Sequence, residues 1–126
     1  MRLLLDTAVL IYAVESPERL SKRSTSIIRN PSNILELSSI SLAEIAIKAA
    51  IGKLMISDAV VKQAIEELDI RVLPYTAEHA LRLFGLPLHH SDPFDRQIIA
   101  QALCEKIPVV TPDDKFDLYE GLTVIW

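Results

Sequence analysis

Five carboxylates in this chain stand at predicted ends of strands or starts of helices, where side chains from distant segments can meet. They are Asp6, Glu44, Asp92, Asp95 and Asp113. At about 4 Å and an effective dielectric constant near 20, each pair of such charges costs about 4 kcal/mol before screening. A cation can compensate that repulsion, and oxygen ligands without thiolate or imidazole favour Mg²⁺ or Mn²⁺. Such an ion can activate a water molecule and stabilise a leaving oxygen, which is the chemistry of phosphodiester hydrolysis.

Each of these acids also has a structural explanation, because carboxylates stabilise helix N-termini. Asp92 stands at a predicted N-cap position before Pro93, and Asp95 lies in the positive field of the same helix start. A cap of this kind contributes about 1 kcal/mol to stability. Capping does not explain why nearly every junction at one edge of the predicted sheet carries a carboxylate. For Asp92 and Asp95 taken alone, both interpretations stay open.

Short apolar runs alternate with helical patterns along the whole chain, which predicts a parallel sheet covered by helices. The predicted strands are residues 3–5, 34–40, 70–73, 108–111 and 122–125. The predicted helical segments, caps included, are residues 8–14, 20–29, 41–51, 57–68, 76–84 and 93–106. Ser41 and Glu44 match the S-x-x-E capping box of the third helix. We therefore expect one domain, residues 1–126, with an α/β fold: a three-layer α/β/α sandwich whose functional crevice lies at the carboxyl ends of the strands.

Composition limits the compartment and the class of partner. The single cysteine, Cys104, excludes a disulfide framework within the chain and favours a cytoplasmic protein. No apolar run approaches the ~20 residues of a membrane helix, so no membrane association is expected. The formal net charge of −4 argues against a general coat for nucleic acid, but a local basic rim around an acidic site is compatible with it.

Other polar residues could support the acids. Thr7 and Thr111 stand beside two of them and could orient a carboxylate or a water molecule, or only cap strand ends. Arg96 follows Asp95, and Lys48 and Lys53 lie nearer the predicted site than the basic residues of segment 19–29. For that segment a solvated helix face is favoured. The three histidines, His79, His89 and His90, lack the usual spacing of a zinc site, which favours loop and surface positions for them.

Four motifs, in residues 3–7, 41–54, 86–96 and 110–116, together resemble the PIN-domain family, in particular the VapC-type toxins of bacterial toxin–antitoxin pairs. The resemblance covers the chain essentially end to end. It implies a Mg²⁺- or Mn²⁺-dependent endoribonuclease with RNA as substrate and Asp6, Glu44, Asp95 and Asp113 as the catalytic acids. Asp6 and Asp95 would be the chief metal ligands, and Asp92 an additional acid. A cognate antitoxin that blocks the site, and a homodimer, are implied as well.

The chain departs from the family pattern at three places. Ala8 stands where a histidine often follows Asp-Thr, residues 11–13 lack the frequent tryptophans, and Ala43 replaces a tryptophan that often precedes Glu44. These changes affect the choice of substrate and antitoxin more than the chemistry. Two alternatives stay open: a catalytically silent PIN-like module that binds RNA or an antitoxin, and a housekeeping RNA-processing nuclease without an antitoxin. The presence of all four acids argues against the silent module.

Overall fold

A parallel five-stranded sheet forms the centre of the molecule. The computed structural model describes residues 1–126. The strands are β1 (Arg2–Leu5), β2 (Ile34–Ser38), β3 (Arg71–Leu73), β4 (Val109–Val110) and β5 (Val124–Ile125). Their order in the sheet is β3-β2-β1-β4-β5, with every neighbouring pair parallel. β1 therefore lies between β2 and β4, which places the carboxyl ends of these three strands at one edge of the sheet.

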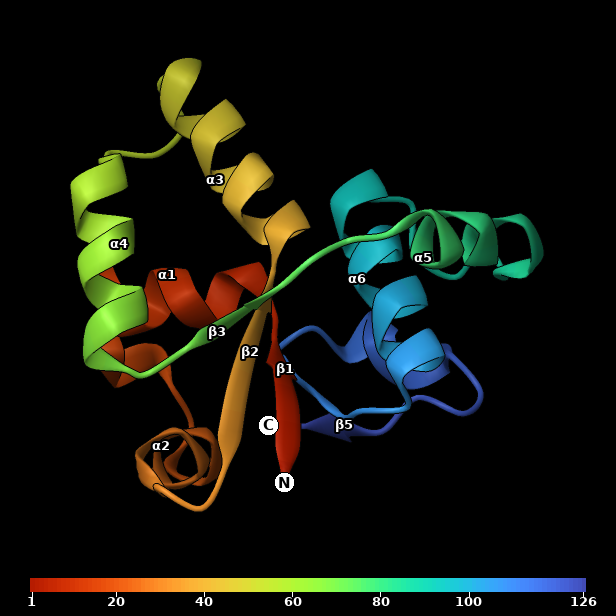
Figure 1. Cartoon of the computed structure of the whole chain (residues 1–126), viewed down its shortest axis with the longest axis horizontal. Coiled ribbons are helices and arrows are strands. Elements are labelled where there is room, and N and C mark those ends of the chain that lie inside the picture. The colour runs from red at the N-terminus through yellow and green to blue at the C-terminus, as the bar shows by residue number, and fades with distance from the viewer.

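Helices cover both faces of this sheet, as Figure 1 shows. They are α1 (Thr7–Glu15), α2 (Lys22–Arg29), α3 (Ser39–Ala50), α4 (Asp58–Glu67), α5 (Ala77–Leu81) and α6 (Pro93–Glu105). Three short 3₁₀ turns complete the chain, at Pro17–Arg19, Arg82–Gly85 and Asp114–Leu118. The predicted helix 76–84 is therefore split into α5 and a 3₁₀ turn. No helix is both long enough and apolar enough to cross a bilayer.

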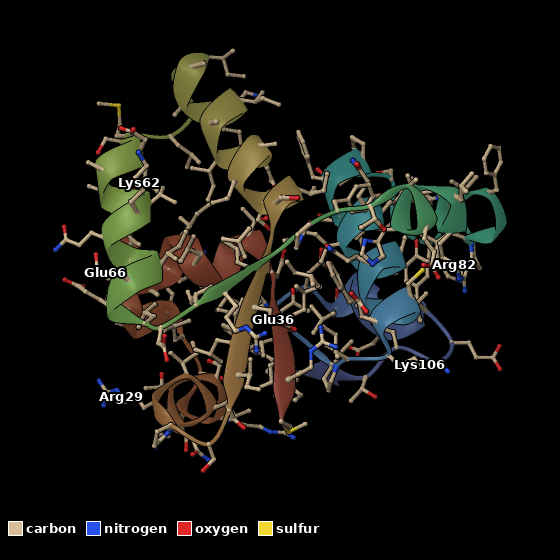
Figure 2. All side chains as sticks on the ribbon, viewed as in Figure 1. Arg29, Glu36, Lys62, Glu66, Arg82 and Lys106 are labelled. Carbon is tan, nitrogen blue, oxygen red and sulfur yellow. The ribbon has the colours of Figure 1, made fainter.

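The alternation of side chains along β1 divides the core into two layers. Leu3 and Leu5 point to one face and pack with α1 and α4, whereas Leu4 points to the other face and packs with α6. All three leucines are at most 1% exposed, as expected for a strand covered on both sides. Charged side chains such as Glu66 and Arg82 lie on the outside of the helical layers (Figure 2). The predicted three-layer α/β/α sandwich is thus confirmed.

The predicted start of the third helix is wrong. α3 begins at Ser39, directly after β2, and the side chain of Ser38 caps it by accepting a hydrogen bond from the Ile40 amide at 3.0 Å. Ser41 lies inside the first turn, where its buried hydroxyl instead accepts a hydrogen bond from Thr7 Oγ1 at 2.8 Å. The capping box expected at Ser41 and Glu44 is therefore absent, and Glu44 is left with no role at the helix start.

Candidate active site

The five acids singled out by their positions line one cavity at the carboxyl edge of the sheet. Asp6 follows β1, Glu44 comes from α3, Asp92 and Asp95 open α6, and Asp113 follows β4. The cavity has a volume of about 400 Å³, and its lining is Asp6, Thr7, Ala8, Ile11, Tyr12, Glu44, Lys48, Asp92, Asp95, Pro112 and Asp113. Lys48 is the only cationic side chain in that lining. The cavity therefore concentrates negative charge from four separate segments of the chain.

Asp6 is buried at the centre of this arrangement. It precedes α1, but its side chain makes no capping hydrogen bond. Instead, its Oδ2 accepts a hydrogen bond from Thr111 Oγ1 at 2.7 Å, which joins the ends of β1 and β4. Burial, opposed by the hydrogen bond from Thr111 and aided by the charge of Glu44, raises the pKa of Asp6 to about 6. Thr111 thus orients a carboxylate, and its hydroxyl also accepts a hydrogen bond from the Asp113 amide at 3.1 Å, so it both orients an acid and caps the strand end.

Asp95 carries the stronger perturbation of the two. Burial, and after it the neighbouring charges of Asp6, Asp92, Glu44 and Asp113, raise its pKa to about 8. Its side chain is 20% exposed, so it faces the open part of the cavity. A carboxylate with so high a pKa lies in a place that lacks positive charge.

Glu44 supplies an oxygen atom without a partner. Its Oε2 forms an ion pair with Lys48 Nζ at 2.5 Å, one turn further along α3. Its Oε1 is buried and accepts no hydrogen bond. A buried acceptor without a partner costs free energy, and a cation is one ligand that would satisfy it. The hydrogen bond to Glu44 is the chief cause of a raised pKa for Lys48, and burial lowers that pKa.

Helix capping accounts for the position of the Asp92 side chain and for one of the two carboxylate oxygens of Asp113. Asp92 Oδ1 accepts hydrogen bonds from the amides of Phe94 and Asp95, at 2.8 and 3.0 Å, so the predicted N-cap is confirmed. Asp113 Oδ1 caps the following 3₁₀ turn through the Lys115 amide at 3.0 Å. The second oxygen of Asp113 takes no part in that cap and faces His90.

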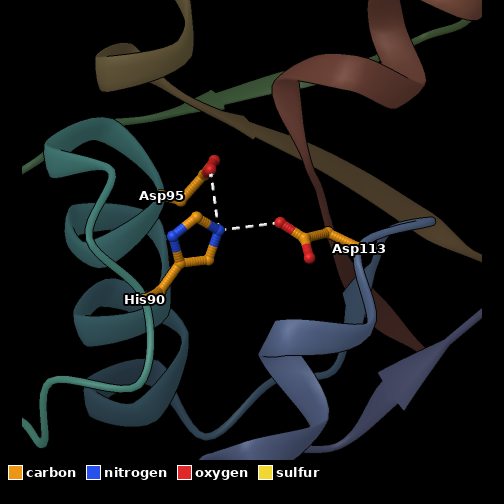
Figure 3. Close-up of side chains that lie close together, drawn as sticks. All are labelled: His90, Asp95 and Asp113. Carbon is orange, nitrogen blue, oxygen red and sulfur yellow. Dashed lines mark hydrogen bonds and ion pairs between the residues drawn. The ribbon is translucent and has the colours of Figure 1, made fainter.

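His90 is the site residue that the sequence did not reveal. The side chain is buried, not on the surface as predicted, and its Nε2 lies 2.7 Å from Asp113 Oδ2 and 3.1 Å from Asp95 Oδ2 (Figure 3). The ligand atoms of these three side chains all lie within 4.8 Å of one another. His79 is also buried, where it accepts a hydrogen bond from the Thr76 amide, whereas His89 is exposed as expected.

Three of the predicted residues, Arg96, Lys53 and Thr111, lie outside the cavity lining. The guanidinium of Arg96 donates hydrogen bonds to the carbonyls of Leu86 and Pro87, at 3.2 and 2.8 Å, so it fixes the segment that leads to His90. Lys53 is exposed in the turn after α3. Thr7 lines the cavity, but its hydroxyl is engaged with Ser41 and not with an acid.

The donor set fits a hard divalent cation. Asp6, Glu44 and Asp95 offer carboxylate oxygens that no capping interaction occupies, and Oε1 of Glu44 has no partner. Burial, and then the charges of the neighbouring acids, raise the pKa values of Asp6 and Asp95, and a bound cation would counter both effects. Mg²⁺ and Mn²⁺ prefer such oxygen ligands.

Known structures resemble the whole chain. DNA-bound VapBC from Salmonella typhimurium matches with a TM-score of 0.73 and 18% identity, over 99% of this chain and 97% of that chain. VapBC2 from Rickettsia felis, bound to a DNA fragment from its promoter, matches with a TM-score of 0.70 and 20% identity, over 99% and 98%. VapBC-5 from Mycobacterium tuberculosis, a member of the VapBC family of toxin–antitoxin systems, has a TM-score of 0.63 and 20% identity, over 98% and 97%. No curated protein sequence matches the chain significantly.

The sequence itself also matches a family model. The model described as the PIN domain matches residues 3–122. That range contains all five acids of the cavity as well as His90 and Thr111. Since the match covers nearly the full length, this chain belongs to the PIN-domain family.

Proposed function

We propose that this protein is a Mg²⁺- or Mn²⁺-dependent endoribonuclease, the toxin of a VapC-type toxin–antitoxin pair. The observation that carries the proposal is the convergence of five carboxylates on one cavity with a single lysine among them. Such a concentration of like charge is costly without a cation. The similarity to VapBC structures supports the toxin class, and membership of the PIN-domain family supports a nuclease.

Asp6 and Asp95 are the proposed chief ligands of the ion, and Glu44 and Asp113 complete the acidic site. When bound, Mg²⁺ or Mn²⁺ supplies a Lewis acid that makes water nucleophilic and neutralises charge on a phosphodiester. Thr111 keeps Asp6 oriented through its 2.7 Å hydrogen bond. A fixed carboxylate loses less freedom when it binds a ligand, so this contact prepares the site in advance.

Basic side chains beside the acids would hold the RNA backbone. Lys48 lines the cavity and is tied to Glu44, and Lys53 extends from the exposed turn that follows α3. Both come from the same end of α3. We propose that they contact RNA phosphates next to the acidic site, which supplies affinity without base recognition.

Replacing Asp6 by asparagine tests the proposal. We expect cleavage of a cellular RNA pool in millimolar Mn²⁺ to fall by at least about 100-fold, because loss of a mere outer-shell partner already costs 10–100-fold. The fold should remain, since Asp6 makes no capping bond. Asp114→Asn, an exposed acid beside Asp113, is the matched control and should cleave as the wild type does. Full activity of Asp6→Asn, or cleavage by the wild type in EDTA, would contradict the proposal.

An apolar groove between α3 and α4 is the proposed docking site of the antitoxin. It has a volume of about 580 Å³ and is lined by Leu42, Ile45, Ala46, Ala49, Ala50, Ile56, Ser57, Asp58, Val61, Lys62 and Ile65. Ile51 and Met55 are exposed beside it. An apolar groove of this size suits the nonpolar face of a helix from a partner.

A charge placed in this groove should disrupt the partner without affecting the chemistry. We expect Ala46→Glu to weaken antitoxin binding by at least about 30-fold, because a glutamate there would be desolvated without a partner. Ala59→Glu is the control, since Ala59 is exposed on α4 but lies outside the groove lining. Calorimetric titration with the antitoxin measures both variants. Unchanged binding of Ala46→Glu would place the antitoxin elsewhere.

A homodimer stays a prediction. Leu81, Phe84 and Leu88 are large apolar side chains that are 63%, 91% and 85% exposed within one segment. Clusters of this kind commonly mark a surface that another protein covers. They are the residues that we expect a second copy of the chain to bury.

A further inference from the structure

We propose that His90 is a positioning residue, whose Nε2–H holds the carboxylates of Asp95 and Asp113 in place for the cation and which does not itself bind the metal. The inference rests on the proposed function. The His90 side chain is buried and lies between two of the acids. Helix capping does not explain this position, and neither does packing against the core alone. Two observations carry the inference: the hydrogen bond that fixes the tautomer, and the packing that fixes the ring.

The backbone fixes the tautomer of His90. The amide of Asp92 donates a hydrogen bond to His90 Nδ1 at 3.2 Å. A ring nitrogen that accepts a hydrogen bond carries no proton, so the proton of the neutral imidazole is on Nε2. Nε2 is then a donor, and it faces Asp113 Oδ2 at 2.7 Å and Asp95 Oδ2 at 3.1 Å. To bind a metal, Nε2 would need a free lone pair, so the proton would have to move to Nδ1. The Nδ1–H group and the Asp92 amide N–H would then face each other as two donors.

The ring cannot easily turn away from this arrangement. It packs edge-on against Phe116, with ring centroids 5.8 Å apart and planes at 88°. The amide of His90 donates to Tyr119 Oη at 2.9 Å, and its carbonyl accepts from Arg96 at 3.4 Å. Backbone and ring are therefore both held, which fixes the direction in which Nε2 donates. Figure 3 shows that Nε2 points toward Asp95 and Asp113.

The shared donor has a specific effect on the two acids. Asp95 belongs to α6 and Asp113 to the segment after β4, so no local structure keeps these like charges together. One N–H, hydrogen-bonded to Asp113 Oδ2 and 3.1 Å from Asp95 Oδ2 in its donor–acceptor distance, orients Asp113 and offsets part of the repulsion between the two groups. Oδ1 of Asp95 accepts no hydrogen bond and remains available to a cation, while Oδ1 of Asp113 is held by the Lys115 amide. His90 thereby leaves an oxygen-only ligand set, which favours Mg²⁺ or Mn²⁺ over Zn²⁺.

Two substitutions separate the two hydrogen-bonding functions of the ring. In His90→Asn the amide oxygen can still accept from Asp92, but the side chain is too short to reach the acids. In His90→Gln an amide N–H can stand near the position of Nε2, but the acceptor for Asp92 is lost. We expect His90→Asn to weaken Mn²⁺ binding by about 10- to 100-fold, and His90→Gln to recover most of that loss.

Binding of Mn²⁺ alone, followed by electron paramagnetic resonance of the free ion, measures this without RNA. His89→Asn, the exposed neighbour, is the control and should bind as the wild type does. Urea unfolding in EDTA shows whether each variant is folded. If His90→Asn bound Mn²⁺ as tightly as the wild type does, the inference would be overturned. It would also be overturned if the wild type bound Zn²⁺ more tightly than Mn²⁺ and both His90 variants lost Zn²⁺ binding, because that result would identify His90 as a metal ligand. A wild type that binds no divalent ion would instead overturn the proposed function.

The tautomer can be measured on the wild type, which keeps the inference testable if a variant does not fold. Nitrogen-15 correlation spectra of the histidine rings distinguish a protonated Nε2 from a protonated Nδ1. We expect His90 to show the Nε2–H form in EDTA and also in saturating Mg²⁺. A bare Nε2 in the Mg²⁺ spectrum would overturn the positioning role.

Discussion

Replacement of Asp95 by asparagine should stabilise the metal-free protein at pH 7 by about 2 kcal/mol while it removes metal-dependent cleavage. The pKa of Asp95 is raised to about 8 from an ordinary value of 3.8, mainly by burial and then by the surrounding acids. Folding at pH 7 must therefore protonate this group or hold a costly charge. An asparagine has the same shape without that charge.

The size of the effect follows from the difference between pH 7 and the ordinary pKa. At about 1.4 kcal/mol per pH unit that difference sets a ceiling of about 4 kcal/mol. The side chain is 20% exposed, and the buried amide needs partners of its own, so we expect about half of the ceiling. Such a combination of higher stability and lost activity is typical of groups kept for function.

Urea unfolding in EDTA measures this prediction. Glu66→Gln removes one negative charge from the outer face of α4, where the side chain is exposed, and should leave stability nearly unchanged (Figure 2). It therefore controls for the change in net charge. A metal-free Asp95→Asn protein that is markedly less stable than the wild type would mean that Asp95 serves the helix start and not a cation.

The stability of the metal-free protein should fall as the pH rises from about 4 to about 8. Asp6 and Asp95 have folded pKa values raised to about 6 and about 8. Above the ordinary value of 3.8, the folded state binds protons that the unfolded state has released, so unfolding becomes easier with rising pH. The loss of stability ends once the pH exceeds the pKa values of Asp6 and Asp95 in the folded state. Asp95→Asn should lack the part of the slope between about pH 6 and 8.

Divalent cations should oppose this trend, because the oxygens proposed as their ligands are the ones that protons occupy. A ligand present at 100 times its Kd stabilises the folded state by about 2.7 kcal/mol. We expect the Mn²⁺-induced rise in Tm to be larger at pH 8 than at pH 5.5, and to be lost in Asp95→Asn. Equal rises at the two pH values would show that Mn²⁺ binds away from Asp6 and Asp95.

Local patterns in the sequence predicted most of the fold and the convergence of the acids. Apolar runs such as Leu3–Leu5 identify buried strands, and Asp92-Pro93 identifies a helix start, because these signals act over a few residues. Strand ends in a parallel sheet meet at one edge, which was enough to predict that Asp6, Glu44 and Asp113 would meet.

The details that depend on loop closure could not be predicted in this way. His90 and Asp113 are 23 residues apart in sequence, and their contact depends on how Arg96 and Tyr119 hold segment 86–90. The direction of Arg96, away from the acids, depends on the same segment. The start of α3 was misplaced because Ser38 and Ser41 are both acceptable caps, and burial of Ser41 against Thr7 decides between them.

The division of the core by β1 has a consequence for local opening. Asp6 begins α1, which packs on one face of the sheet, whereas Asp95 and His90 belong to the layer of α6 on the other face. The two proposed chief ligands, Asp6 and Asp95, thus come from different layers. If either layer opened alone, as hydrogen exchange often detects, it would separate them. A bound cation would therefore fasten the two layers together and make their amide protons exchange as one cooperative unit.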